Sequence, residues 1–150
     1  MSPSLNPETH APVAHDEPPA NTGLRVPRRF TVPNVHPFDA VTWDKRRTVI
    51  TNPDGSVVFQ ADDVEVPADW SQLATDIVVS KYFRRAGVPG TPGRENSVRQ
   101  VVNRLVRTIR TAGEQQGGYF ATAEDAEAFE SELAYMLVHQ IGAFTAPVWF

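Results

Sequence analysis

Four histidines and no cysteine make up the chain's supply of imidazole and thiol groups. Without a thiol there can be no disulfide, no thiolate metal site and no redox-active cysteine pair, so any thiol chemistry has to come from outside these residues. His10 and His15 have no further ligand at usable spacing, which favours two solvated residues over a metal site. His36 and His139 stand beside no serine or aspartate at the spacing of a catalytic pair. The sequence therefore predicts no catalytic residue and no metal site.

Two further features are typical of phosphate or nucleic-acid binding, and each has a plainer interpretation. The Gly/Pro-rich stretch from Gly87 to Gly93 leads into a predicted helix, where backbone N–H groups can hold a phosphate. It lacks the Lys-Ser/Thr ending of a phosphate-binding loop, so a mobile loop is the favoured interpretation. Between Lys81 and Arg110 the one acidic residue is Glu95, whereas the chain after Arg110 has acidic residues and no basic one. Aromatic residues do not alternate with these arginines, so we expect a solvated or acid-paired face and no nucleic-acid partner.

Length and composition fit one folded domain. The chain has 150 residues, a net charge of −4 and 41% apolar residues, and no apolar run approaches the length of a membrane span. The amino terminus lacks the basic-then-apolar pattern of a secretory signal, so we expect no membrane association and a cytoplasmic location. Residues 1–24 are rich in proline and poor in branched apolar side chains, which predicts a disordered tail before a domain over residues 25–150. Arg25, Arg28 and Arg29 are expected in an exposed linker at its start.

A β-hairpin is predicted after Phe38. Its strands are rich in β-branched and aromatic residues and are expected over Thr48–Thr51 and Ser56–Gln60. Between them, Pro53-Asp54 suits the central positions of a type I turn, and Gly55 supplies the positive φ that closes the hairpin through a bulge. Two strands are marginally stable alone, so the hairpin must pack on other elements.

Apolar residues at three- and four-residue spacing predict three amphipathic helices, over residues 70–84, 96–112 and 122–143. Asp69 is expected to cap the first helix and Thr122 the third, because their side chains can accept a hydrogen bond from a free backbone N–H. His139 is expected to be partly buried and hydrogen-bonded. The predicted fold is mainly α with one hairpin, an α+β class. Its predicted core consists of Trp70, Leu73, Ile77, Val102, Leu105, Ile109, Phe129, Leu133 and Leu137.

The last residues have the composition of a buried strand. Pro147 interrupts the preceding helix, and Val148-Trp149-Phe150 is β-branched and aromatic. We expect the start of a barrel strand here, with its rings forming an exposed apolar patch unless a partner covers them.

Several short segments can be compared with known families. They are Phe30-Thr31, Val35-His36-Pro37-Phe38-Asp39, Trp70-Ser71-Gln72-Leu73-Ala74-Thr75-Asp76, Lys81-Tyr82-Phe83, Gly118-Tyr119-Phe120-Ala121, Ala143-Phe144 and Pro147-Val148-Trp149-Phe150. Together they closely resemble the amino-terminal region of class II, adenosylcobalamin-dependent ribonucleotide reductases, over about residues 25–150.

The resemblance implies a segment of an enzyme that reduces ribonucleotides to deoxyribonucleotides with a cysteine thiyl radical, formed when the cobalt–carbon bond of the cofactor breaks. In the family this chemistry belongs to a ten-stranded α/β barrel with the radical cysteine, the reducing cysteine pair and the catalytic Asn and Glu. The resemblance thus implies an N-terminal scaffold that ends where the barrel begins, with that barrel as its partner in the same or a separate chain. We expect the isolated chain to bind no adenosylcobalamin and to be inactive.

One departure from the family concerns two candidate substrate-binding residues, Thr145 and Ala146. The family has Asn-Ser before Pro-Val-Trp-Phe, the serine being similar to a substrate-contacting hydroxyl residue, and alanine offers no hydroxyl. Thr145 would then have to provide the oxygen. The alternative is a truncated or degenerate copy that acts as a protein-interaction module.

Overall fold

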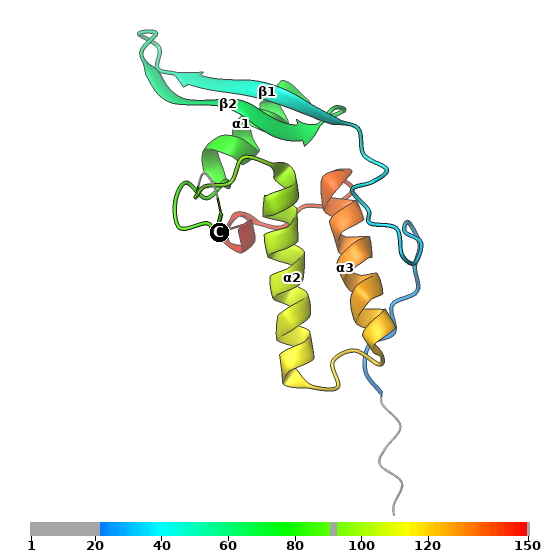
Figure 1. The fold of residues 1–150 in the computed structure, drawn as a ribbon. Coiled ribbons are helices and arrows are strands. Elements are labelled where there is room, and N and C mark those ends of the chain that lie inside the picture. The colour runs from blue at the N-terminus through cyan, green and yellow to red at the C-terminus, as the bar shows by residue number, and fades with distance from the viewer. Residues whose placement is uncertain (1–21, 91–92, 150) are drawn as a thin grey trace, which may run out of the picture.

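The computed structural model describes residues 22–90 and 93–149, so most of the predicted tail and Phe150 lie outside the described residues. The elements follow one another as β1 (Trp43–Thr51), β2 (Val57–Pro67), α1 (Gln72–Lys81), α2 (Val98–Gln116), α3 (Ala123–Val138) and a 3-10 helix, η1 (Ala146–Trp149). Figure 1 shows α2 and α3 side by side, with the hairpin lying across one end of the helices. The predicted α+β class, an antiparallel hairpin with three helices, is confirmed.

The hairpin is longer than predicted, but its turn is as expected. Gly55 has a φ of 86°, and its N–H donates to the carbonyl oxygen of Asn52 at 2.9 Å. The strands are longer because the half of the hairpin away from the turn packs on the core, where Val64 and Val66 of β2 are buried. At the turn end, Val57 and Val58 remain exposed.

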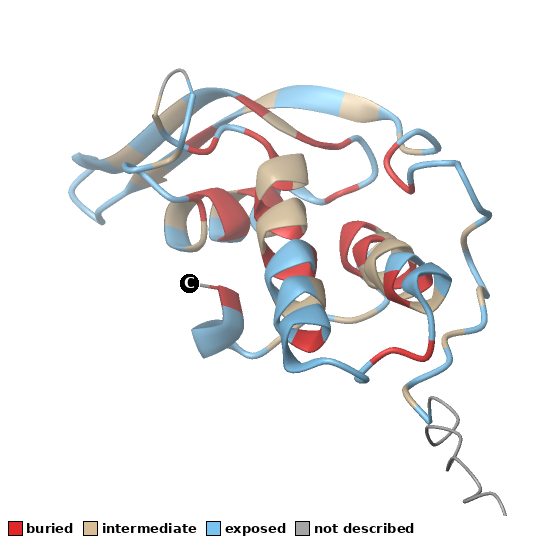
Figure 2. Cartoon of the chain, turned by 60° about the horizontal axis from the view of Figure 1, so that its bottom comes forward, coloured by how far each residue is buried: buried red, intermediate tan, exposed pale blue. Residues whose placement is uncertain are grey.

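The core lies where α2, α3 and the hairpin face one another, and Figure 2 shows the buried segments gathered there. On α2 the buried residues recur at three- and four-residue spacing, as an amphipathic helix requires, and a capping box formed by Ser97 and Gln100 marks the helix start. Burial of Trp70, Val102, Leu105 and Leu137 is confirmed. The predicted core residues Ile109, Phe129 and Leu133 are half-buried.

The prediction for α1 was wrong in its cap and in its buried face. The Ser71 hydroxyl, not the Asp69 carboxylate, accepts the hydrogen bond from the N–H of Ala74. Leu73 and Ile77, expected in the core, are 69% and 48% exposed. The buried side of α1 consists of Thr75, Val78 and Val79, of which Val78 was expected to face inward. Since α1 is apolar on both sides, the spacing of its apolar residues could not show which side faces inward.

The ends of the two long helices also differ from prediction. α2 continues through Gly113 to Gln116. The missing side chain at Gly113 lets the rings of Tyr119 and Phe120 pack against the helix, because a Cβ at that position would lie 2.9 Å from an atom of each ring. α3 ends at Val138 rather than residue 143, and Gln140 takes a left-handed φ of 54° that turns the chain away. Its predicted start is confirmed, since Thr122 accepts a hydrogen bond from the N–H of Asp125.

The segment from residue 22 to Phe38, here called the arm, runs along α3 and is hydrogen-bonded to it (Figure 1). Arg25 and Arg29 are exposed, as expected, whereas Arg28 is half-buried. Leu24, which was predicted to lie in the tail, pairs with the chain beside Phe120. The carboxylate of Glu132, on α3, accepts hydrogen bonds from the N–H groups of Phe30 and Thr31 and from the Thr31 hydroxyl at 2.6–3.1 Å. Burial raises the pKa of Glu132, but these hydrogen bonds together outweigh burial, so its pKa lies below the ordinary value.

The C-terminal residues form η1 and not the predicted strand. The N–H of Val148 donates to the carbonyl oxygen of Thr145 at 3.1 Å, closing a tight turn. The indole N–H of Trp149 donates back to the carbonyl oxygen of Phe144 at 2.7 Å, and the Trp149 ring is buried. Among residues 22–90 and 93–149 no strand pairs with this segment, so turn hydrogen bonds satisfy its backbone.

Candidate functional site

The candidate site is a groove between α1 and the chain that follows α3, here called the C-terminal groove. Its lining is mainly apolar and aromatic and consists of Trp70, Ala74, Ile77, Val78, Tyr82, Leu137, Gln140, Gly142, Ala143, Phe144 and Trp149. On one side, Trp70 is fixed because its indole N–H donates to the carbonyl oxygen of Val138 at 2.7 Å. On the other side, the ring of Trp149 lies 5.4 Å from the ring of Tyr82, centroid to centroid. Such a lining suits contact with apolar surface rather than acid–base chemistry.

A buried ion pair holds the groove's wall in place. The guanidinium of Arg104, on α2, donates to the carbonyl oxygens of Trp149 at 3.0 Å and of Tyr82 at 3.1 Å. Its Nε donates to Glu95 at 2.8 Å, and the other Glu95 oxygen accepts from the N–H of Arg84 at 2.8 Å. The Glu95 side chain is only 3% exposed. One guanidinium thus ties α2 to the end of α1 and to η1.

Glu95 and Arg104 were not among the predicted site residues. The available signal was the position of Glu95 as the lone acid in a basic stretch. An isolated carboxylate among arginines is well placed to become buried with one of them, because a buried charge has to be paired. Several arginines lie near Glu95 in the sequence, so their positions could not show that Arg104 would be its partner.

The two predicted substrate-binding residues, Thr145 and Ala146, lie together at the start of η1. Both are exposed, and neither lines the C-terminal groove. They are held near Trp149 by the turn that η1 forms, so the Arg104 contact with Trp149 also positions them.

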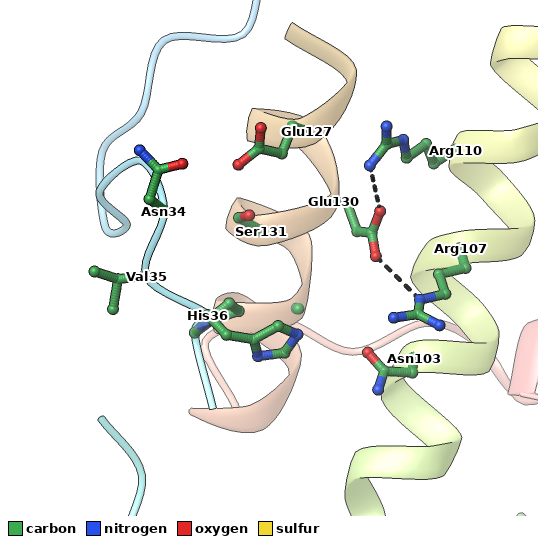
Figure 3. A pocket seen from close by; sticks show the side chains of 11 residues that line it. Asn34, Val35, His36, Asn103, Arg107, Arg110, Glu127, Glu130 and Ser131 are labelled. Atoms are coloured by element: carbon green, nitrogen blue, oxygen red, sulfur yellow. Dashed lines mark hydrogen bonds and ion pairs between the residues drawn. The ribbon is translucent and has the colours of Figure 1, made fainter. Parts of the chain in front are cut away.

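A second, polar pocket lies between the arm and the facing sides of α2 and α3 (Figure 3). Glu130 bridges two arginines there, since its oxygens lie 3.3 Å from Nε of Arg107 and 2.7 Å from Nη1 of Arg110. The hydrogen bond to Glu130 is the main reason that the pKa of Arg110 is raised. The expected pairing between the basic and the acidic parts of the chain is confirmed here, and these charges serve helix pairing.

The two histidines of the described chain do not form a catalytic arrangement. His36 is exposed and its Nδ1 accepts from the N–H of Phe38 at 3.2 Å. His139 is half-buried beside Tyr135, with 4.2 Å between ring centroids, and its buried Nε2 has no hydrogen-bond partner within the described residues. The expected partial burial of His139 is confirmed, but a hydrogen bond to Nε2 is not found. Over residues 22–90 and 93–149 there is no cluster of three His, Cys, Asp or Glu residues suited to a metal ion.

Sequence relatives decide the family. The model of the family described as class II vitamin B12-dependent ribonucleotide reductase matches residues 44–140. The chain belongs to this family. It is 54% identical over 132 residues to the vitamin B12-dependent ribonucleotide reductase of Streptomyces coelicolor, covering 87% of this chain and 13% of the relative. The protein of the same name from Rhodopirellula baltica is 50% identical over 115 residues, covering 76% of this chain and 11% of the relative.

The chain therefore spans about an eighth of the length of the curated relatives that it matches. The family match begins at residue 44, close to the start of β1, and ends at residue 140, directly after α3. It thus covers the hairpin and all three helices, but not residues 141–149, several of which line one side of the C-terminal groove.

Neither a thiol nor a histidine lines the C-terminal groove, and the charged groups of the polar pocket are largely paired with one another.

Among residues 22–90 and 93–149, none of the helices has both the length and the apolar composition that a membrane span requires.

Proposed function

We propose that this chain is the N-terminal scaffold of a vitamin B12-dependent ribonucleotide reductase, which makes deoxyribonucleotides for DNA synthesis. The observation that carries the proposal is the 54% identity over 132 residues to a protein of that name. Identity of this degree across the hairpin and all three helices is support for a shared fold and a shared place in the enzyme. A cytoplasmic location, beside the nucleotide pool, belongs to the same proposal.

In this proposal the chain contributes structure and the rest of the enzyme contributes chemistry. Adenosylcobalamin, bound elsewhere in the enzyme, supplies the radical that starts the reduction. No cysteine is present in the 150 residues, so the thiols that the reaction consumes would come from the catalytic barrel. What the chain itself provides is a fixed position for η1, through the hydrogen bonds of Arg104.

Thr145 and Ala146 are the residues of this chain that we place nearest the substrate. Their support is the family resemblance of the segment before Pro147 and their exposure at the start of η1. The Thr145 hydroxyl can donate to or accept from a nucleotide oxygen, whereas Ala146 can only pack against it. Thr145 would therefore take over the contact that a serine makes in the family.

A second candidate function is a protein-interaction module. The exposed apolar side chains of α1, Leu73 and Ile77, favour it, since a stable monomer seldom leaves such residues together on its surface. Such a module would bind another protein without taking part in nucleotide reduction.

Two assays test these proposals, one on the isolated chain and one on a chimera. The chimera is the Streptomyces coelicolor reductase in which this chain replaces the matching region. We expect the isolated chain, given adenosylcobalamin, a dithiol and ribonucleotides, to leave the cofactor's absorbance unchanged and to form no deoxyribonucleotide. The chimera should form deoxyribonucleotide. An inactive chimera, prepared beside an active parent enzyme, would contradict the scaffold proposal and leave the interaction module.

A further inference from the structure

The outward side of α1 carries two exposed apolar residues between the exposed polar residues Gln72 and Lys81. Leu73 and Ile77 stand one helical turn apart and are 69% and 48% exposed. The opposite side of the same helix buries Val78 and Val79 in the core. A helix that packs on one side only normally carries polar residues on the other, so two apolar residues on the outward side indicate a second packing partner.

This side of α1 continues into the C-terminal groove. Ile77 belongs to both, because it is exposed on α1 and also lines the groove with Ala74 and Tyr82. Across the groove stand Phe144 and Trp149, and Val148 beside them is 40% exposed. We call this continuous surface the docking face; it consists of Leu73, Ala74, Ile77, Tyr82, Phe144 and Trp149.

The docking face carries no ionised side chain of its own. Its partner must therefore offer apolar surface, since a charged group brought against it would lose water without gaining an opposite charge.

We propose that the docking face binds the catalytic portion of the reductase, the part of the enzyme that follows this domain in the family. The proposal rests on the proposed function. It is supported by size, because the matching region is only 13% of the Streptomyces coelicolor enzyme and has to be seated on the remainder. It is also supported by position, because Trp149, the last residue that the structure describes, lines the groove.

The tip of the hairpin provides a matched control surface. Val57 and Val58 are 57% and 61% exposed, close to the exposure of Leu73 and Ile77. They are flanked by the polar residues of the turn and lie at the end of the hairpin away from α2 and α3 (Figure 1). Exposure alone therefore does not distinguish the two pairs. They differ because Ile77 lines the C-terminal groove, whereas Val57 and Val58 do not line it.

The first test is hydroxyl-radical footprinting, read by mass spectrometry, on the isolated chain and on the chimera. We expect oxidation of Leu73 and Ile77 to fall about fivefold or more in the chimera, because an interface excludes solvent from its centre. Oxidation of Val57 and Val58 should stay within about twofold, because the hairpin tip remains in water. Equal oxidation of Leu73 and Ile77 in the two samples overturns the proposal.

The second test compares two double variants of the chimera. Leu73→Asp with Ile77→Asp should lower deoxyribonucleotide formation about tenfold or more, whereas Val57→Asp with Val58→Asp should change it less than about twofold. Circular dichroism of the isolated chain should be the same for both variants, since all four side chains are exposed. Equal activity of the two variants overturns the proposal. If both variants remain active, the proposed function still stands.

A second copy of this chain is the competing occupant. Light scattering on the isolated chain over a range of concentrations measures it directly. We expect a monomer, or an association that Leu73→Asp with Ile77→Asp does not change. A dimer that these substitutions abolish, found together with an unprotected docking face in the chimera, assigns the face to self-association and overturns the proposal.

Discussion

Replacing Arg104 by methionine should destabilise the domain and release η1. The change keeps most of the side chain's length but leaves Glu95, 3% exposed, as a buried carboxylate without its cation. Removing one partner of a buried ion pair costs about 3–5 kcal/mol. The carbonyl oxygens of Tyr82 and Trp149 also lose their donor. Because the Arg104 side chain is 14% exposed and water can reach part of the site, we expect about 3 kcal/mol.

The matched control is Arg107→Met, one turn further along α2. Arg107 also pairs with a glutamate, at 3.3 Å, but its side chain is 67% exposed. An exposed ion pair contributes about 0.2–1 kcal/mol, so this variant should lose less than about 1 kcal/mol. The two substitutions change the same residue type on the same helix, so the difference between them measures the burial of the Arg104 ion pair together with its two carbonyl contacts.

Urea denaturation followed by circular dichroism gives the free energy of unfolding of each variant. Tryptophan fluorescence in the absence of urea sums Trp43, Trp70 and Trp149, and it should shift to longer wavelength if Trp149 leaves its buried position while the other two stay in place. In a double variant, Glu95→Gln should recover part of the loss caused by Arg104→Met, because it removes the unpaired charge. The reasoning is refuted if Arg104→Met and Arg107→Met lose the same free energy, or if Glu95→Gln adds to the loss.

Three further predictions concern the arm and the core. The pKa of Glu132 is lowered in the folded state, so its contribution to stability should be complete above the ordinary glutamate pKa. That contribution should be lost as pH falls through this value and below, which gives a fall in the free energy of unfolding at acid pH. Glu132→Gln should make this fall shallower in denaturation measured from pH 7 downward. Gly113→Val should cost about 1–3 kcal/mol, because its side chain would overlap the neighbouring rings, whereas Ala112→Val on the exposed side of α2 should cost less than about 1 kcal/mol. Trp70→Phe should cost about 1–3 kcal/mol by urea denaturation, because the buried carbonyl oxygen of Val138 loses its donor.

Each of these predictions has a clear contrary result. A fall at acid pH that persists unchanged in Glu132→Gln would show that other carboxylates govern it. Equal losses at positions 113 and 112 would show that the rings move aside freely. A Trp70→Phe variant as stable as the parent would show that water replaces the indole as donor.

Local chemistry made part of this fold predictable. Gly55 and Thr122 act within four residues of their partners, so turn and cap rules place them correctly. Ser71 shows the limit of such rules, because Asp69 and Ser71, two positions apart, both have side chains that can cap α1, and it is Ser71 that accepts the N–H of Ala74. Leu73 shows another, because a helix with two apolar sides has no preferred inward side until its neighbours are known.

Long-range pairing escaped prediction for a different reason. Glu132 binds the arm from more than a hundred positions away along the chain, and nothing in its own neighbourhood distinguishes it from the exposed acids of the same helix. The terminal aromatic residues were misjudged because their β-branched and aromatic content describes burial, which a tight turn provides as well as a strand does. The family resemblance placed Thr145 and Ala146, and their exposure on η1 does not test their role.

The account's central claim is that this chain is a scaffold of a vitamin B12-dependent reductase. The most direct measurement is the adenosylcobalamin-dependent rate of deoxyribonucleotide formation by the chimera, relative to the parent Streptomyces coelicolor enzyme, at matched concentrations. We predict a rate within about tenfold of the parent, because the replaced region supplies position rather than reacting groups. A chimera that is folded and carries the cofactor yet forms no deoxyribonucleotide would contradict the claim.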